Sequence, residues 1–172
     1  MAKDWKGFER TVAKSLGSWW GCVFRRTPSS GAWGKQGQSR FAKKSQDAAG
    51  DFHGDIVAPP EADFPFSVEC KCYREVEIYK AMYGKSNVWD FWAQCRRDTP
   101  EGMYPMLVMK ENMKKPLMGV SMDFFNKIKP RIRAKHVPYL IMRGQGYMLV
   151  VMDLASFTSN ISAIYIKKQL GL

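Results

Sequence analysis

The chain has 172 residues, of which 45% are hydrophobic, and this composition excludes a wholly disordered protein. Lysine and arginine number 27 against 16 aspartate and glutamate residues, which gives a formal net charge of +11. This excess favours a polyanionic partner, first nucleic acid and second an anionic membrane. No apolar run reaches the length of about 18 residues that a membrane-spanning helix needs, and the charged N-terminus lacks the apolar centre of a signal peptide. We therefore expect an intracellular protein of one domain, residues 1–172, with no membrane partner.

The 4 cysteines and 2 histidines do not have the spacing of a zinc site. Cys70 and Cys72 form a C-x-C pair, whereas zinc sites use paired C-x-x-C or Cys/His spacings. A reducing compartment would keep these cysteines as thiols, so we expect free cysteines rather than a metal cluster or disulfides.

The N-terminal segment predicts an amphipathic helix over residues 3–17. Its apolar residues recur at spacings of three and four, and Gly17 is the expected end of the helix. Residues 19–28 then predict a short strand that Pro28 ends.

Residues 29–50 predict a long loop rich in Gly, Ser, Gln and basic residues. Loops of this length inside a domain are usually functional or disordered. Its cations, Lys35, Arg40, Lys43 and Lys44, can contact phosphates, and Trp33 and Phe41 can stack on bases. The alternative is a solvated loop with no specific role, and we favour DNA contact.

The rest of the chain predicts strands that alternate with helices. Residues 54–58 and 66–72 predict two strands, which we expect to pair antiparallel. Residues 87–98 predict a helix with Ser86 as its N-cap, because four apolar residues fall on one face. Further expected elements are paired strands at 105–110 and 116–122, a short helix at 123–128, a hairpin over 137–153 and a helix or strand at 154–170. A basic run at 126–135 would place several charges on one face if extended, although such runs are usually only solvated.

Two charged residues near the end of the second predicted strand are the main functional signal. Glu69 and Lys71 are two residues apart and therefore point to the same face of a strand. With antiparallel pairing, Asp55 lies beside them. Two converging carboxylates bind a hard cation such as Mg²⁺, and the Cys70 backbone carbonyl can add a further oxygen. A neighbouring lysine can orient water or stabilise charge on a phosphate, as metal-assisted phosphodiester hydrolysis requires.

The alternative for these residues is an ordinary ion pair at the end of a sheet. Glu9, on the predicted first helix, can supply a third carboxylate that completes this metal site or helps to form a second one. Its own alternative is a solvated charge paired with Lys6 or Arg10. The strongly basic chain and the position of both acidic residues on apolar strands favour the metal site.

The segments GFERTVAKSLG, FRRTPSSG, GDIVA and VECK, followed by a helix with Gln94 and then PMLVMK, resemble the PD-(D/E)xK nuclease superfamily. Within it, the chain is most similar to archaeal-type Holliday-junction resolvases, including those that phages carry. The likeness spans about residues 6–110, and residues 111–172 form a C-terminal β-hairpin and helix extension that the likeness does not cover. The resemblance implies an α/β fold of the restriction-endonuclease type, a mixed central β-sheet flanked by helices.

The resemblance also implies the site and the partners. Asp55, Glu69 and Glu9 would be metal ligands and Lys71 the catalytic lysine, with Ser30 near the scissile phosphate. The predicted DNA-binding residues are Arg10, Arg25, Arg26, Lys35, Arg40, Lys43 and Lys44. The implied cofactor is Mg²⁺, which Mn²⁺ would replace. The implied protein is a homodimer in the cytoplasm or nucleoid of a prokaryotic host, and it would nick four-way junctions in pairs.

Two other functions stay open at this point. One is a PD-(D/E)xK nuclease that acts on duplex, nicked or flapped DNA. The other is a DNA-binding module without catalytic activity, whose acidic residues would serve only the structure. Removal of divalent metal would abolish turnover by a nuclease but would leave such a module unaffected.

Overall fold

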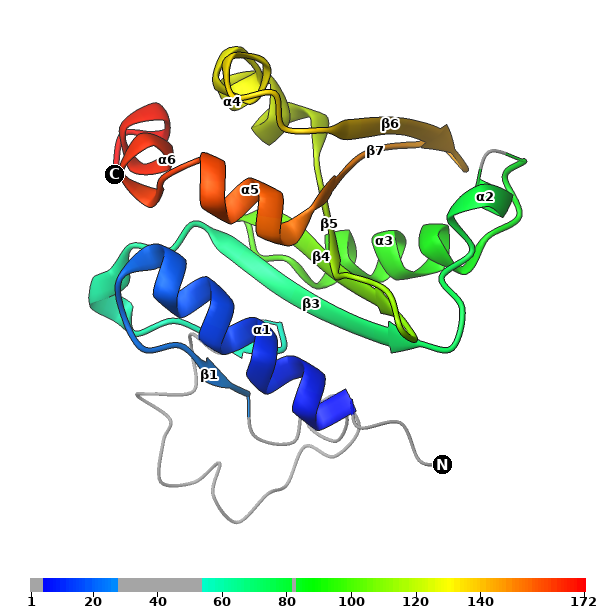
Figure 1. The fold of residues 1–172 in the computed structure, drawn as a ribbon, viewed down its shortest axis with the longest axis horizontal. Helices are drawn as coiled ribbons and strands as arrows, with labels where there is room; N and C mark the ends of the chain where they lie inside the picture. Colours follow the sequence, from blue (N-terminus) through cyan, green and yellow to red (C-terminus); the bar gives the residue numbers. More distant parts are fainter. Residues whose placement is uncertain (1–4, 28–53, 82) are drawn as a thin grey trace.

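The structure is a computed structural model that describes residues 5–27, 54–81 and 83–172 (Figure 1). Its elements in chain order are α1 (Trp5–Trp20), β1 (Arg25–Arg26), β2 (Ile56–Val57), the 3₁₀ turn η2 (Pro60–Ala62), β3 (Phe66–Tyr73), α2 (Ile78–Ala81), α3 (Asn87–Asp98), β4 (Tyr104–Glu111), β5 (Leu117–Val120), α4 (Met122–Ala134), β6 (Tyr139–Gly144), β7 (Tyr147–Asp153), α5 (Leu154–Asn160) and α6 (Ala163–Leu170). Within the described residues, no helix is both long and apolar enough to cross a lipid bilayer.

A mixed five-stranded sheet forms the centre of the molecule. Its strand order is β3-β4-β5-β7-β6, with β3 and β4 parallel and the other neighbours antiparallel. The C-terminal strands therefore belong to the same sheet as the strand that carries Glu69 and Lys71. The expected mixed central sheet flanked by helices is confirmed.

Helices cover both faces of this sheet, and strand β4 shows how the two layers arise. Its alternating side chains divide between two hydrophobic clusters, Met106 and Val108 in one and Leu107 and Met109 in the other. The first cluster packs under α1, α4, α5 and α6, and the second packs under α3. Figure 1 shows α1 and α5 on the near side of the sheet and α3 on the far side. A strand that is buried on both faces reads as a continuous apolar run, as residues 105–109 do.

Helix α1 is longer than its sequence pattern predicts. It continues through Gly17 to Trp20, and the chain leaves the helix at Gly21, whose φ is 88°. Gly17 therefore does not end the helix. Glycine is needed there because the following segment packs closely against it, and a Cβ at this position would lie 2.6 Å from the Cys22 carbonyl oxygen. The expected strand over 19–28 is correspondingly reduced to β1.

The predicted antiparallel pairing of residues 54–58 with residues 66–72 is wrong. Strand β2 pairs antiparallel with β1 instead, and Gly54, which precedes β2, forms an isolated parallel bridge with Val68 of β3. The connection explains the difference, because it does not fold back as a hairpin. Pro59 and the 3₁₀ turn η2 redirect the chain, and Asp63 adopts a left-handed conformation with φ 48°.

The second half of the chain follows its sequence pattern more closely. Helix α3 begins after Ser86, whose Oγ accepts a hydrogen bond from the Val88 N–H, as an N-cap does. The strand pair β4–β5 and the hairpin β6–β7 are confirmed, with Gln145 and Gly146 at positive φ in the turn. The basic run at 126–135 is helical rather than extended, because α4 continues to Ala134, and residues 154–170 form the two helices α5 and α6.

Candidate active site

A cavity of about 430 Å³ collects the charged residues that the sequence singled out. Glu9 comes from α1, Asp55 immediately precedes β2, and Glu69 and Lys71 come from β3. The remaining lining residues are Trp5, Phe8, Cys70, Cys72, Tyr73 and Gln94. The structure therefore brings together four side chains from three segments that are distant in the sequence.

Glu69 and Lys71 lie on the same face of β3, as their spacing predicts. The Lys71 ammonium Nζ lies 2.6 Å from Glu69 Oε1, and both side chains are largely buried, 15% and 13% exposed respectively. A buried ion pair of this kind is costly to break, because the remaining partner would be an uncompensated charge in a poorly solvated site. Lys71 also lies 5.7 Å from the centre of the Phe91 ring on α3.

Gln94 on α3 holds both members of this pair. Its Oε1 accepts a hydrogen bond from Lys71 Nζ at 2.9 Å, and its Nε2 donates to Glu69 Oε1 at 3.1 Å. The sequence analysis noted Gln94 only as part of a helix in the order of segments that resembles the nuclease superfamily, and it predicted no role for this side chain. The signal that could have found it was its position three residues after the buried Phe91, at the edge of the apolar face of the helix.

Asp55 reaches the site through backbone contacts with β3 rather than through a strand ladder. Its N–H donates to the Val68 carbonyl at 2.7 Å, and its Oδ2 accepts a hydrogen bond from the Cys70 N–H, also at 2.7 Å. The preceding residue, Gly54, has φ +75°, and a Cβ there would lie 2.4 Å from the Val68 carbonyl oxygen. Only glycine tolerates this close approach in the left-handed region, so Gly54 makes the placement of Asp55 possible.

The carboxylates of the cavity act on one another and on the strand between them. Burial and then the negative charge of Asp55 raise the pKa of Glu69, against the opposing effect of Lys71. Burial, followed by the charges of Asp55, Glu9 and Glu69, raises the pKa of the Cys70 thiol well above its usual range. The charges of Glu9, Asp55 and Glu69 therefore act on one another's surroundings within a largely buried site.

The chemistry of these donors fits a hard divalent cation. Carboxylate and carbonyl oxygens are the ligands that Mg²⁺ prefers. Among the residues that the structure describes, no group of three His, Cys, Asp or Glu side chains is close enough together to hold a metal ion as it stands.

Arg26 Nε lies 3.3 Å from Glu9 Oε2 and supplies positive charge to that carboxylate. The Cys70 carbonyl stays a predicted ligand, and the N–H of the same residue donates to Asp55.

The predicted DNA-binding arginines lie beside this cavity. Arg10 and Arg25 are exposed, whereas Arg26 pairs with Glu9, donates to the Thr27 carbonyl at 3.1 Å and lies 5.7 Å from the centre of the Trp5 ring. Several other predicted residues fall outside the described part of the chain, namely Ser30, Lys35, Arg40, Lys43 and Lys44, together with the aromatic residues Trp33 and Phe41.

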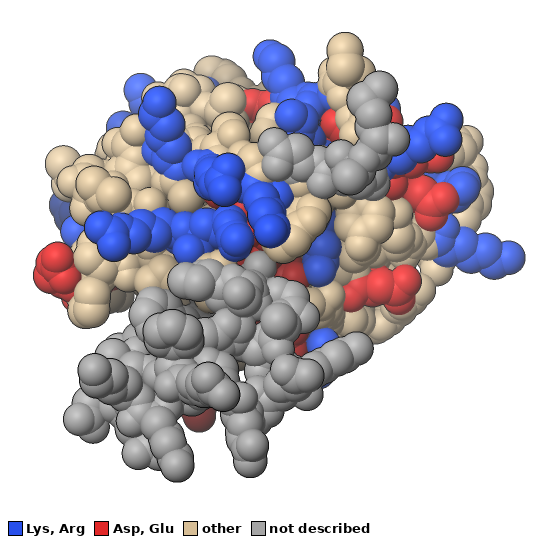
Figure 2. Space-filling model, turned by 90° about the horizontal axis from the view of Figure 1, so that it is seen from below, with Lys and Arg blue, Asp and Glu red and all other residues tan. Residues whose placement is uncertain are grey.

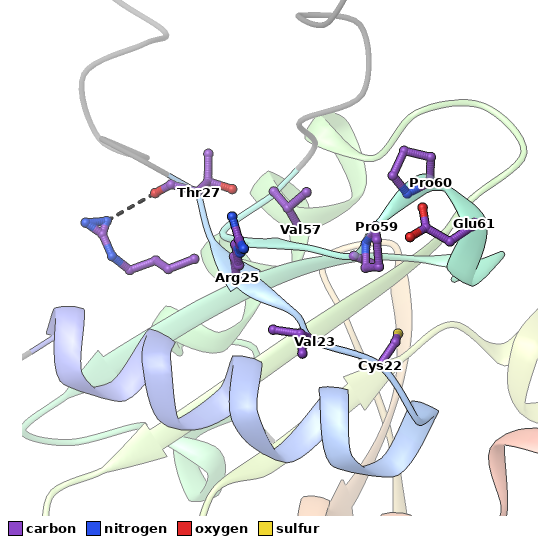
Figure 3. Close-up of a pocket in the computed structure, with 10 residues that line it drawn as sticks. Cys22, Val23, Arg25, Thr27, Val57, Pro59, Pro60 and Glu61 are labelled. Atoms are coloured by element: carbon purple, nitrogen blue, oxygen red, sulfur yellow. Dashed lines mark hydrogen bonds between the residues drawn. The ribbon is translucent and has the colours of Figure 1, made fainter.

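A second cavity, of about 670 Å³, lies between residues 22–27 and 57–61 (Figure 3). Its lining is mainly apolar and includes Val23, Val57, Pro59 and Pro60, and Glu61 is the one carboxylate that the described residues contribute. One carboxylate without a partner cannot assemble the oxygen-rich site that a hard cation needs. The donors that suit a hard cation therefore lie in the smaller cavity around Glu69 rather than here.

Comparison with known protein families gives one match. The model of the family described as "Phage putative PDDEXK endonuclease" matches residues 6–168, almost the whole chain. The chain belongs to this family. No match was found among curated proteins or among solved structures.

Membership of the PDDEXK family confirms the superfamily that the sequence resembles and its restriction-endonuclease-like fold. The match also includes residues beyond 110, where the resemblance noted in the sequence ends. The protein is thus a nuclease by family, and PDDEXK nucleases in general use divalent metal ions. The roles of the individual site residues stay predictions.

Gln94→Leu tests whether the α3 amide positions Glu69 and Lys71 for the predicted reaction. The change removes both hydrogen bonds while keeping similar volume, so we expect cleavage to slow by about 10- to 100-fold as Lys71 loses its fixed position. DNA affinity should stay unchanged, because Gln94 lies within the cavity and carries no charge. Single-turnover cleavage and a separate binding measurement would check this, with the exposed Gln169→Leu as control. Equal single-turnover rates for the two variants would contradict the positioning role.

Proposed function

We propose that the protein is a metal-dependent endodeoxyribonuclease that hydrolyses phosphodiester bonds in the cavity around Glu69. The observation that carries this proposal is the convergence of Glu9, Asp55, Glu69 and Lys71 on that one cavity. Three carboxylates beside a lysine suit hydrolysis of a phosphodiester better than binding alone, because burial of like charges is costly unless a cation is held there.

Glu9, Asp55 and Glu69, with the Cys70 carbonyl, would hold Mg²⁺, and Mn²⁺ would substitute for it. When bound, such a cation polarises the phosphate and makes water a better nucleophile at neutral pH. Lys71 places a positive charge 2.6 Å from Glu69 Oε1, where it can orient water or stabilise charge that develops on the phosphate. Gln94 holds the lysine in that position through its Oε1. Ser30 would complete the site near the scissile phosphate.

For the substrate we propose branched DNA, with the four-way junction first, cut by a homodimer. The similarity of the sequence to archaeal-type junction resolvases supports this more specific proposal, and the basic surface beside the cavity is compatible with it. Duplex, nicked or flapped DNA would keep the same chemistry and change only the substrate.

Cleavage of a labelled four-way junction and of a linear duplex of the same sequence tests the proposal. With Mg²⁺ or Mn²⁺ we expect paired symmetric nicks in the junction, and with EDTA we expect none. Equal cutting of the linear duplex would keep the nuclease and overturn the junction as substrate. Tight DNA binding without cleavage in any divalent metal would overturn the enzyme and leave a DNA-binding module.

A further inference from the structure

Helix α1 carries a row of cations that leads away from the catalytic cavity. Lys6, Arg10 and Lys14 are exposed and follow one another at intervals of four residues, which places them on one side of the helix. At a rise of about 1.5 Å per residue, neighbouring cations of this row are about 6 Å apart along the axis. The row starts at the end of α1 where Trp5, Phe8 and Glu9 line the cavity.

A groove runs beside this row, between α1 and the segment that follows it. The groove has a volume of about 850 Å³, and among the described residues its lining includes four cations, Arg10, Lys14, Arg25 and Arg26, but no aspartate or glutamate. Gly17 and Gly21, which have no side chains, form part of its wall. Several cations along one groove suit a ligand that carries a chain of phosphates better than a ligand with one carboxylate, because a single carboxylate can pair with only one or two of them.

The cations continue beyond the end of α1 onto the C-terminal helices. Lys167 of α6 lies with its Nζ 5.1 Å from the centre of the Trp20 ring on α1, and its charge lowers the pKa of the Cys22 thiol, against the larger raising effect of burial. Arg131 of α4 in turn lies 5.6 Å from the Tyr165 ring on α6. These two contacts place α6 beside the C-terminal end of α1 and α4 beside α6.

We call the series of cations Lys6, Arg10, Lys14, Arg25, Lys167, Lys168 and Arg131 the basic track. Within the described parts of the chain, none of these seven cations forms an ion pair with a carboxylate. Some cations outside the track do pair with carboxylates, namely Lys80 with Glu77, Arg97 with Asp98 and Lys114 with Glu111, whereas others among the described residues, such as Lys85 and Lys115, form no ion pair. Figure 2 shows a row of Lys and Arg side chains across the left of the face seen from below, while the acidic side chains gather mainly on its right.

We infer that the basic track binds the sugar–phosphate backbone of a duplex arm that extends from the scissile phosphate along α1 towards α6 and α4. Unpaired like charges repel one another, and a polyanion that follows the track relieves this repulsion along its whole length. The inference rests on the proposed nuclease function and adds the direction in which DNA leaves the active site. It also assigns DNA contact to α4 and α6, which lie at the other end of α1 from the cavity.

The inference predicts a dependence on arm length. Helix α1 has 16 residues, a length of about 24 Å, which corresponds to about seven base pairs of duplex. An arm of about 6 base pairs therefore reaches only the α1 part of the track, whereas an arm of about 18 base pairs also reaches α6 and α4. Both arms can be closed by a hairpin so that the shorter one stays paired.

The test compares two variants that remove the same amount of charge. The track variant combines Lys14→Gln, Lys167→Gln, Lys168→Gln and Arg131→Gln. The control variant combines Lys80→Gln, Lys85→Gln, Lys114→Gln and Lys115→Gln, all exposed and on the side of α2 and the β4–β5 turn. DNA affinity is measured at several salt concentrations with each arm length, in the presence of Ca²⁺ so that binding is separated from cleavage.

For the long arm, the slope of log affinity against log salt should fall by about 0.9 for each phosphate that the variant no longer neutralises, so by about 3.6 in the track variant, which lacks four cations. For the short arm the slope of the track variant should fall by about 1, because Lys14 is the only one of its four substituted cations that the short arm reaches. The control variant should keep the wild-type slopes. Equal slopes for the two variants on the long arm would overturn the inference.

Failure of the inference and failure of the proposed function give different results. If wild type cleaves DNA with Mg²⁺ but both variants bind alike, the track is wrong and the nuclease stands. If wild type never cleaves but only the track variant has a reduced long-arm slope, the track stands and the nuclease is wrong.

A second track variant covers the case in which the first one does not fold. The first variant removes the cations that lie against the Trp20 and Tyr165 rings, and these two ring contacts help to join the helices. Lys14→Gln with Lys168→Gln leaves both ring contacts in place. Its slope should fall by about 2 on the long arm, and an unchanged slope in this folded variant would overturn the inference.

Discussion

Glu69→Gln and Lys71→Ala should each lower the rate of DNA cleavage by about 10²- to 10⁴-fold. Glu69→Gln removes a negative charge from the cavity that would hold the metal, and it leaves Lys71 beside a neutral amide. Lys71→Ala removes the ammonium group that lies 2.6 Å from Glu69 Oε1. Single-turnover cleavage of labelled DNA in saturating Mg²⁺ would measure both losses.

The matched controls for this pair are Glu77→Gln and Lys80→Ala. Glu77 and Lys80 also form a Glu–Lys ion pair, but the Lys80 side chain is 56% exposed and both lie outside the cavity. Exposed pairs contribute little, so these variants should cleave at the wild-type rate. A Lys71→Ala protein that is folded and cleaves as fast as Lys80→Ala would show that the buried pair is structural only.

Gly54→Ala should abolish cleavage and lower the free energy of unfolding by about 2 kcal/mol. The added methyl group would lie 2.4 Å from the Val68 carbonyl oxygen, which is backbone and cannot rotate away. Relief of this clash requires the chain around Gly54 to move off β3, and Asp55 would move with it. Denaturant unfolding and cleavage assays on the same preparation would measure the two effects.

Gly102→Ala is the control for the conformational part of this loss. Gly102 also has a positive φ, +84°, but a Cβ there has no other atom within 4 Å. We expect this variant to lose a similar or smaller amount of stability and to retain full cleavage. If Gly54→Ala also retained full cleavage, the position of Asp55 would not matter for the reaction.

Local patterns predicted those elements whose partners are near in the sequence or whose ends carry a clear signal. The helix after Ser86 has its apolar face and its cap within one segment, and the β6–β7 hairpin has its turn between its own strands. The shared face of Glu69 and Lys71 likewise needs only the alternation of side chains along one strand.

The features that sequence patterns did not predict depend on distant contacts. Alternation shows that residues 54–58 are extended, but it does not tell which strand they pair with, and the partner is β1 rather than β3. Gly17 was predicted to end the helix because glycine is common at helix ends. Its actual role, to leave room for the Cys22 carbonyl, depends on a contact that the helical pattern does not contain. The role of Gln94 was equally hidden, since its two partners lie on β3.

The two sides of the active site differ in how firmly they are held. Glu69 and Lys71 belong to a strand of eight residues whose entire length is paired with β4. Asp55 contacts β3 at the outer edge of the sheet, where its N–H donates to the Val68 carbonyl and its Oδ2 accepts from the Cys70 N–H. Local opening at this edge costs far less free energy than global unfolding. Because Ile56, the residue after Asp55, is buried in the hydrophobic core, we expect any such opening to be confined to the turn around Asp55 and to change the spacing of the carboxylates without disturbing β3.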